Sequence, residues 1–339
     1  MTGSNALNVI EARPEDAAVI VDIIHRSFGA RPVLDPPTSA LDETVESVAA
    51  TLATAGGLLV ERRGRPMGAL LFDESRPGQL GLKRVCVDPD IQARGVASAM
   101  VGVAEDTAEE RGKDGIWLDV REELPETVQF WSRRLYHPVG RVGPFIEFGK
   151  TLWLAREVPT PDEMQALAGR LAPLLRPGDL LVLSGDLGAG KTTFTQGLGE
   201  ALGVRGPVTS PTFVLARTHP SLVGGLPLVH VDAYRLGGLD EIDDLDLDST
   251  TESSVTVVEW GEGMAEQLTD SWLHIKIEVR GPRPIDPLGT PHHGELTADL
   301  DEVDPRVVTI KPHGPRWVGV PLRSTLLAHP GAEERVSTP

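Results

Sequence analysis

The stretch GDLGAGKTT, from Gly185 to Thr193, contains the pattern G-x-x-x-x-G-K-[ST]. In this pattern a glycine-rich turn opens a helix, and its backbone N–H groups hold nucleotide phosphates with help from the helix dipole. The surroundings agree, because an apolar run (LLVL, residues 180–183) precedes the turn and an apolar helix face follows it. Lys191 is then expected to reach the β- and γ-phosphates, and the Thr192 hydroxyl to bind Mg²⁺.

Two acidic residues are candidates for the carboxylate that such a site needs beside Mg²⁺, at the C-terminal end of a neighbouring buried strand. Glu259 ends the run VTVVE, and Asp232 ends LVHVD. An acidic cap or turn residue is the alternative for either one, but two such strands in one domain favour at least one functional carboxylate. Glu259 has the clearer metal-ligand pattern, whereas Asp232 is expected to bind a metal-held water or to orient the attacking water.

The second half of the chain alternates helix and strand signals. Residues 160–163 (TPDE) match a capping box with proline at the first helical position, so we expect a helix to begin there. Strands are predicted at five apolar runs, residues 180–183, 228–231, 255–260, 273–279 and 307–310. Strands separated by helices imply an α/β domain with a mostly parallel sheet covered on both faces. Residues 281–304 are expected to form a loop or hairpin insert, and residues 323–339 a disordered tail.

Four motifs together resemble the TsaE family, bacterial ATPases required for making threonylcarbamoyladenosine in tRNA. In chain order they are GDLGAGKTTF from Gly185, VTSPTFVLA from Val208, HVDAYRL from His230 and VVEWGE from Val257. All four occur in the family's order and at compatible spacings, across residues 159–320. A P-loop alone would name only a superfamily, so the combination carries the resemblance.

The resemblance implies a role for each motif. Thr192 and Glu259 hold Mg²⁺, and the loop at residues 209–213 is switch-like and lies near the γ-phosphate. Trp260 flanks the site, although simple packing explains Trp260 and Tyr234 equally well. The implied catalytic residues are Lys191, Asp232 and Glu259. The implied ATP contacts are Asp186, Leu187, Gly188, Ala189, Gly190, Lys191, Thr192, Thr193, Thr212 and Trp260.

The resemblance also implies a partner, the TsaB–TsaD pair that carries out carbamoyl transfer, with tRNA contacted through that complex. The composition is consistent with tRNA binding by the partner and not by this chain. Acidic residues outnumber basic ones, 50 to 32, and the formal net charge is −18. Because phosphate backbones are bound by clustered Lys and Arg, this charge argues against a broad nucleic-acid surface on the chain itself. A solvated acidic surface that aids solubility is the simpler explanation of the charge.

A second glycine turn lies in the first half of the chain. The run Gln92-Ala93-Arg94-Gly95-Val96-Ala97 resembles the Q/R-x-x-G-x-G/A signature of GNAT acetyltransferases, set after a strand and opening a helix. Helix, hairpin, strand, signature helix and strand follow in GNAT order over residues 8–157. The resemblance implies a mixed central sheet with helices and acetyl-CoA as cofactor. The turn would cradle the CoA pyrophosphate, and the strand residues Val85 and Val87 would offer backbone groups to the pantetheine arm.

Acetyl transfer needs a base for the amine proton and often an acid, commonly a tyrosine, for the leaving thiolate. Trp131 occupies the position expected for that tyrosine, and Tyr136 lies five residues further on. Glu61 and Asp73 are candidate bases, but exposed charges at hairpin ends explain them equally well. Packing explains Cys86 better than a nucleophilic role does. The acceptor amine is not readable from the sequence, and binding of acyl-CoA without turnover is the alternative.

The size and composition of the chain are consistent with two domains. Its 339 residues exceed one typical domain core, and we expect a GNAT-like domain at residues 1–157 and a TsaE-like P-loop domain at residues 158–322. Cys86 is the only cysteine, which excludes an intrachain disulfide and a cysteine-based metal cluster. A secretory signal and a membrane-spanning apolar run are both missing from the sequence, so a cytoplasmic location without membrane contact is expected.

Two other functions fit parts of the sequence. The first is an N-acetyltransferase whose P-loop half is a regulatory nucleotide-binding module. The second is a small-molecule kinase, which requires an acceptor pocket and an Arg-rich lid over ATP. Arg217 and Arg235 are isolated, so the kinase ranks last. Dependence of ATP turnover on the TsaB–TsaD pair would separate the tRNA-modification ATPase from both.

Overall fold

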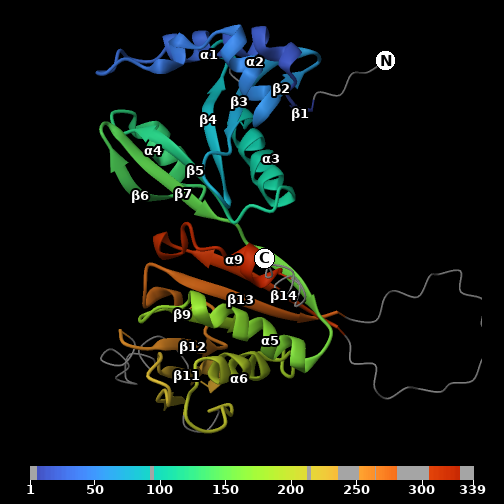
Figure 1. Ribbon diagram of the computed structural model, residues 1–339, viewed down its shortest axis with the longest axis vertical. Coiled ribbons are helices and arrows are strands. Elements are labelled where there is room, and N and C mark those ends of the chain that lie inside the picture. The colour runs from blue at the N-terminus through green and yellow to red at the C-terminus, as the bar shows by residue number, and fades with distance from the viewer. Residues whose placement is uncertain are drawn as a thin grey trace, which may run out of the picture. The chain divides into compact units, whose positions relative to one another are not determined.

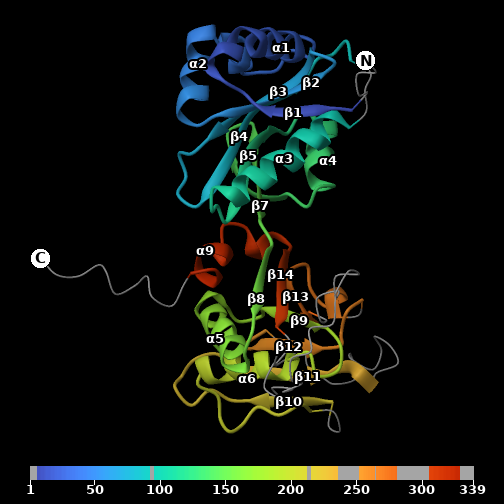
Figure 2. The same ribbon diagram turned by 90° about the vertical axis from the view of Figure 1, so that its right-hand side faces the viewer.

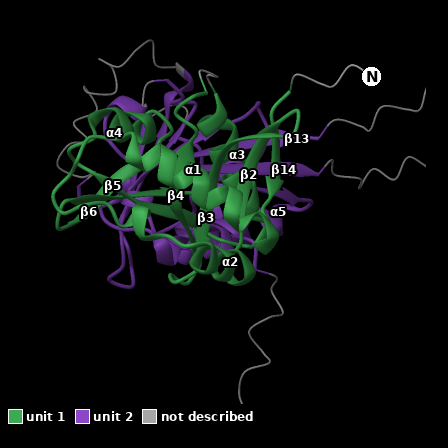
Figure 3. Ribbon diagram, turned by 90° about the horizontal axis from the view of Figure 1, so that it is seen from above, with its two compact units in different colours: residues 1–152 green, residues 153–339 purple. Residues whose placement is uncertain are grey.

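The computed structural model describes residues 6–91, 95–211, 215–235, 252–263, 265–280 and 305–328. The chain forms two compact units that divide between Leu152 and Trp153, and each has its own seven-stranded sheet (Figure 3). The boundary expected after residue 157 falls inside β8 (Leu154–Val158). This strand pairs with β14 (Arg306–His313) of the second sheet, where its backbone hydrogen bonds are made.

Unit 1 contains a mixed sheet with the strand order β1-β2-β3-β4-β5-β7-β6. Only the β4–β5 pair is parallel among its described pairings. The mixed sheet predicted for this half is therefore confirmed. Its strands are β1 (Asn8–Glu11), β2 (Gly57–Arg62), β3 (Arg65–Asp73), β4 (Gln79–Val87), β5 (Gly115–Arg121), β6 (His137–Val142) and β7 (Phe145–Thr151), and its helices are α1 (Ala17–Gly29), α2 (Val45–Thr54), α3 (Val96–Glu110) and α4 (Pro125–Ser132).

Helices cover both faces of this sheet because neighbouring strand residues point to opposite sides. Leu59 of β2 and Leu71 of β3 pack with the apolar residues of α1 and α2. Their neighbours Leu58 and Leu70 pack in a second core with α3 and α4 (Figures 1 and 2). The continuous apolar runs of β2 and β3 are thus those of strands buried on both faces.

Strands β4 and β5 stay paired for a short distance only. Their ladder joins Gln79–Gly81 to residues 115–117. Beyond it, β4 carries a bulge opposite β3, where Arg84 has the left-handed φ of 53°. A bulge of this kind bends a strand and interrupts its pairing. The C-terminal ends of the two parallel strands are therefore free of each other, next to the N-terminus of α3.

Unit 2 has the strand order β10-β11-β12-β9-β13-β14-β8. The four central strands, β11, β12, β9 and β13, are parallel, and the outer strands pair antiparallel. This parallel centre confirms the predicted P-loop type of sheet. The remaining elements are α5 (Pro161–Leu171), β9 (Leu180–Ser184), α6 (Lys191–Ala201), β10 (Ala216–His219), β11 (Leu228–Asp232), β12 (Val255–Glu259), β13 (Trp272–Val279) and α9 (Leu322–Leu326).

The C-terminal end of unit 2 differs from the sequence-based expectation. The tail was expected from residue 323, but the first part of it forms α9, whose Leu322 and Leu326 are buried in the core with α5. Apolar burial on one helix face outweighs the weak local signal of five residues. The insert at residues 281–304 and the rest of the tail, 329–339, lie outside the described residues. No helix among the described residues is both long and apolar enough to cross a membrane.

Helices α5 and α6 lie side by side on one face of this sheet (Figure 2). Their close approach depends on Gly197, where an added Cβ would lie 2.3 Å from the Gln165 Cα and 2.4 Å from its carbonyl oxygen. Backbone atoms do not move aside as a flexible side chain does. A side chain at position 197 must therefore separate the two helices.

We predict that Gly197→Ala lowers the free energy of unfolding by about 1–3 kcal/mol, the usual cost of overpacking. Gly169→Ala is the matched control on α5, because its Cβ would meet only the Ala201 Cβ at 3.8 Å. It should be neutral or stabilising by about 0.5–1 kcal/mol, since alanine favours helix over glycine. Urea denaturation of both variants checks this, and equal stability of the two would contradict the packing argument.

Candidate functional site

The glycine turn of unit 2 runs from the end of β9 to the start of α6. Gly185 has φ 144°, and an added Cβ there would lie 2.2 Å from the Ile277 carbonyl oxygen, so only glycine fits. Gly188 and Gly190 also have positive φ, and Gly190 is the N-cap of α6. Backbone N–H groups at such a helix start are the donors that bind phosphate. The strand–turn–helix predicted around GDLGAGKTT is therefore present.

Lys191 is 5% exposed and lies across the inside of this turn. Its Nζ donates to the carbonyl oxygens of Gly185 (2.8 Å) and Asp186 (3.0 Å). The same ammonium lies 3.7 Å from the centre of the Trp260 ring, a cation–π contact. Burial lowers the pKa of Lys191, while the carboxylates of Glu259, Asp232 and Asp186 oppose that shift. Its direct partners among the described residues are neutral, and phosphate oxygens would be better partners for a desolvated charge.

Glu259 ends β12 and is buried beside the start of α6. The Thr192 hydroxyl donates to its two carboxylate oxygens at 3.1 and 3.3 Å. His230, fully buried on β11, donates from Nε2 to Oε1 of Glu259 at 2.9 Å. The carboxylate is therefore held from two elements and kept next to the Thr192 hydroxyl.

Asp232 lies beside Glu259 because the two residues are register partners on the parallel strands β11 and β12. It accepts a hydrogen bond from the Ser210 hydroxyl at 2.9 Å and from the backbone N–H of Tyr234 at 3.1 Å. Both carboxylate oxygens are thus engaged, and the group has a fixed direction. Its pairing with Ser210 connects Asp232 to the loop expected to respond to the γ-phosphate.

The donor set at this edge fits Mg²⁺. The Thr192 hydroxyl and the Glu259 carboxylate are adjacent oxygen ligands, the kind that Mg²⁺ prefers together with phosphate and water. Their mutual hydrogen bond is one that a metal ion can replace. His230 would keep the carboxylate in place by its separate bond.

Two aromatic residues border the site. Trp260 has the left-handed φ of 64°, which is unusual for a bulky residue. Its backbone N–H donates to the Leu183 carbonyl. Tyr234, 64% exposed, meets the Trp260 ring edge-on at 5.2 Å. A strained backbone at the end of a buried strand is typical of functional sites, and here it turns the indole over Lys191.

The remaining predicted nucleotide contacts are distributed as follows. Asp186, Leu187 and Gly188 are exposed at the outer side of the turn, and Leu187 is 90% exposed. Ala189 is buried, and Thr193 is partly buried on the first turn of α6. Thr212 lies outside the described residues. His230 was missed by sequence reasoning, although its position two residues before Asp232 on one strand predicts that both side chains face the same way.

The second glycine turn opens α3 in unit 1. Gly95 is the N-cap of α3 with φ 95°, and Val96 and Ala97 begin the helix. Val85 and Val87 are partly buried at the end of β4 that pairs with β3 but no longer with β5. Gln92, Ala93 and Arg94 lie outside the described residues. Strand, glycine turn and helix thus follow each other here as they do in unit 2.

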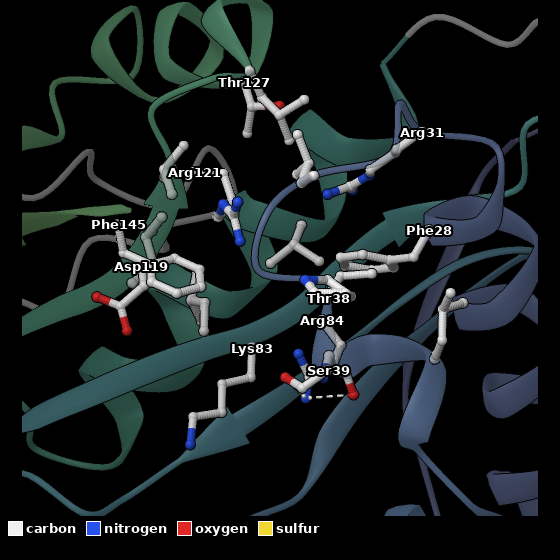
Figure 4. A pocket seen from close by; sticks show the side chains of 18 of the residues that line it. Phe28, Arg31, Thr38, Ser39, Lys83, Arg84, Asp119, Arg121, Thr127 and Phe145 are labelled. Carbon is white, nitrogen blue, oxygen red and sulfur yellow. Dashed lines mark hydrogen bonds between the residues drawn. The ribbon is translucent and has the colours of Figure 1, made fainter. Parts of the chain in front are cut away.

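A cavity of about 450 Å³ lies where β4 and β5 separate, bordered by the segment between α1 and α2 and by α4 (Figure 4). Trp131 lines it, whereas Tyr136 does not. The Tyr136 hydroxyl is buried and donates to Glu105 at 3.0 Å, and burial raises its pKa well above the ordinary value. No tyrosine is therefore available to the cavity among its described lining residues.

The bases proposed from the sequence are not at the cavity either. Glu61 and Asp73 are absent from its described lining, and Asp73 is ion-paired with Lys83. Asp119 of β5 does line the cavity and was missed, because a single acid in the strand GIWLDV carries no pattern of its own. Partial loss of solvent raises the pKa of Asp119, and the nearby Glu147 raises it further. Such a carboxylate is a better proton acceptor than an ordinary one.

Comparisons with known proteins are consistent with both halves. Residues 158–284 match the family model of the threonylcarbamoyl adenosine biosynthesis protein TsaE, and residues 22–135 match that of the acetyltransferase (GNAT) family. The tRNA threonylcarbamoyladenosine biosynthesis protein TsaE of Streptomyces coelicolor is 68% identical over 116 residues, which are 34% of this chain and 78% of that protein.

Two solved structures also resemble parts of the chain. Bacillus subtilis YdiB is 32% identical, covers 52% of this chain and 95% of its own, and has a TM-score of 0.37. The PaiA N-acetyltransferase of Thermoplasma acidophilum in complex with coenzyme A is 11% identical, covers 43% of this chain and 99% of its own, and has a TM-score of 0.40.

Cys86 is predicted to be chemically inert in the native chain. It is 3% exposed, its thiol donates to the Ala69 carbonyl, and burial raises its pKa to about 12 from an ordinary 9.0. Ellman's reagent should therefore label no thiol in the native chain and one per chain after unfolding. Above pH 9 the unfolded chain loses the thiol proton and the folded chain keeps it, so stability from this group falls between pH 9 and 12. Rapid labelling of the native chain would identify an accessible nucleophile instead.

Proposed function

Because this chain belongs to the TsaE family, we propose that unit 2 is an Mg²⁺-dependent ATPase required for threonylcarbamoyladenosine formation in tRNA. One observation carries the proposal. Lys191, Thr192, Glu259 and Asp232 meet at the C-terminal edge of the parallel strands, beside a glycine turn whose conformation only glycine allows. That edge is where nucleotides bind in open α/β sheets.

Different residues of the chain would have different roles in hydrolysis. The turn amides and Lys191 would bind the phosphates, whose oxygens would replace the Gly185 and Asp186 carbonyls around Nζ. Because Lys191 is buried, its charge acts through a weakly screening medium and stabilises phosphate charge more than an exposed lysine would. Trp260 keeps the ammonium directed into the turn.

Thr192 and Glu259 would hold Mg²⁺, with His230 fixing the carboxylate. When bound, the ion would supply positive charge that offsets the negative charge developing on the phosphate oxygens. Asp232 would orient the water that attacks the γ-phosphorus, and the bond from that phosphorus to the β,γ-bridging oxygen would break to release ADP. Ser210 and the Tyr234 N–H hold Asp232 for this role.

The TsaB–TsaD pair is the proposed partner, and tRNA would be contacted through it. A net charge of −18 disfavours a large RNA surface on this chain. Leu187 and Tyr234, both largely exposed, border the nucleotide site and are available to a partner protein. A partner bound there would sense whether the site holds ATP or ADP.

We also propose acyl-CoA-dependent transfer to an amine in unit 1. The observation behind it is the separation of β4 from β5 beside the N-terminus of α3, with the cavity and Asp119 at the same place. The separated strand edge suits a pantetheine arm, and the helix N-terminus suits the pyrophosphate. Asp119 would take the amine proton.

In a reconstituted threonylcarbamoylation of tRNA that lacks only this component, the native chain should restore multiple turnovers with ATP and Mg²⁺. Lys191→Ala should lower the rate by about 100-fold or more, because a buried cation that contacts the transferring phosphate is lost. Lys311→Ala removes an exposed lysine of the same unit and should have no effect. Failure of the native chain to restore turnover, with ATP binding intact, would refute the tRNA role.

For unit 1, Asp119→Asn should lower acetyl transfer to a panel of primary amines by about 100-fold or more, the usual contribution of a general base. Release of CoA thiol reports the rate, and Asp106→Asn, an exposed carboxylate on α3, is the control. CoA binding should be unchanged in both variants. A full rate for Asp119→Asn would show that another group takes the proton.

A further inference from the structure

The lining of the cavity in unit 1 contains more cationic side chains than carboxylates. Its described lining contains four cations, Arg31, Lys83, Arg84 and Arg121, and one carboxylate, Asp119 (Figure 4). The other lining side chains are mainly apolar, among them Phe28, Leu34, Trp117 and Phe145. A cavity of this composition suits a ligand that is apolar in its body and anionic at one point.

Three of the four cations are already neutralised within the chain. Lys83 pairs with Asp73, Arg84 with Glu43 at 2.8 Å, and Arg121 with Glu123 at 2.9 Å. Arg84 also donates to the Ser39 hydroxyl at 3.1 Å, which holds its left-handed backbone in the bulge. Arg121 donates to the carbonyl oxygens of residues 35 and 36 as well. These three side chains shape the wall and have little charge left for a ligand.

Arg31 is different. Among the described residues it makes no ion pair and its guanidinium donates no hydrogen bond, although its side chain is only partly exposed. The guanidinium lies 3.9 Å from the centre of the Phe28 ring and points into the cavity (Figure 4). Burial lowers the pKa of Arg31. An anion that enters the cavity would restore the lost interactions.

Asp119 and Arg31 lie on opposite sides of the cavity (Figure 4). Asp119 is on β5, where the strands separate, and Arg31 follows the end of α1. A ligand that spans the cavity thus meets a proton acceptor at one end and, at the other, a guanidinium that no described residue pairs with. Apolar and aromatic side chains lie between them.

We propose that this cavity binds an amino-acid-like acceptor, a primary amine with an apolar body and a carboxylate, and that Arg31 binds the carboxylate. The inference rests on the acyl transfer proposed for unit 1 and names its acceptor class. A planar guanidinium matches a carboxylate with two parallel hydrogen bonds. Polyamines and other polycations are disfavoured, because they carry no anionic group for Arg31 to bind.

The transfer itself balances without another reactant. The neutral amine nitrogen attacks the thioester carbonyl carbon, a C–N bond forms and the C–S bond breaks. The electron pair of that bond leaves on the CoA sulfur. Asp119 takes the proton from nitrogen, and solvent supplies the proton to the thiolate, since no tyrosine hydroxyl is in the described lining.

Binding is tested first with unreactive product analogues on the full chain, with and without saturating CoA. The matched pairs are N-acetyl-L-phenylalanine against N-acetyl-2-phenylethylamine, and N-acetyl-L-leucine against N-acetyl-3-methylbutylamine. In each pair only the carboxylate differs. At least one carboxylate ligand should bind at least about 10-fold more tightly by calorimetry than its neutral partner, the usual gain from a charge-assisted hydrogen bond.

The variants assign the effect to one residue. Arg31→Gln should abolish the preference, Arg31→Lys should retain part of it, and Arg13→Gln, an exposed arginine outside the cavity lining, should leave it unchanged. Circular dichroism checks that each variant folds. Equal affinity within both pairs, no binding by any ligand, or a preference that survives Arg31→Gln would each overturn the proposal.

Catalysis separates this inference from the activity on which it rests. Release of CoA thiol from acetyl-CoA is followed with L-phenylalanine and 2-phenylethylamine, and with L-leucine and 3-methylbutylamine. Carboxylate-selective binding without any transfer would keep the acceptor site and refute the acyl transfer. Transfer that is equally fast with and without the carboxylate would keep the acyl transfer and overturn the acceptor class.

Discussion

The candidate nucleotide site depends on the parallel register of β11, β12 and β9. That register makes Asp232 and Glu259 direct neighbours at the edge where β9 runs into the glycine turn. Parallel strands end at the same edge of a sheet, so side chains from separate segments meet there without any long loop to carry them. A shift of β12 by one residue would turn the Glu259 carboxylate to the opposite face and away from Thr192.

Burial strengthens the electrostatic interactions of the polar groups at this site. Lys191, Glu259, Asp232 and His230 are all nearly inaccessible, and each has a defined partner. In a weakly screening interior a satisfied network is rigid, and an unsatisfied group is costly. Lys191 depends on neutral carbonyls and an indole ring in place of a carboxylate contact. That arrangement leaves the lysine available to phosphate while the rest of the site stays ordered.

Unit 1 contains the same local strand–turn–helix arrangement, but its strands are arranged differently. A strand runs into a glycine turn that caps a helix, as in unit 2, but β4 is bulged and leaves β5 after a short ladder. The bulge depends on Arg84, whose unfavourable φ is stabilised by Glu43 and Ser39 from the segment after α1. The two parallel strands therefore enclose a space in unit 1, whereas continuous pairing in unit 2 closes the sheet.

The local chemistry of the candidate site could be predicted from the sequence. The glycine turn, Lys191, Thr192 and the acids that end two apolar runs follow from spacing, because each role depends on residue type and on a strand or helix that forms locally. The two-domain organisation and the TsaE and GNAT likenesses follow from motif order. The roles of the individual site residues, including those outside the described part of the chain such as Thr212 and residues 92–94, remain predictions.

Tertiary structure decided what depends on contacts between distant segments. His230 reaches Glu259 only because two strands pair in one register, and Asp119 faces a cavity only because β4 and β5 separate. The short helix α9 forms because its leucines find a core, and β8 joins unit 2 because its hydrogen-bond partner is β14. That Arg31 has no ion-pair partner in the described part of the chain likewise could not be predicted from the sequence, because it depends on which segments fold around it.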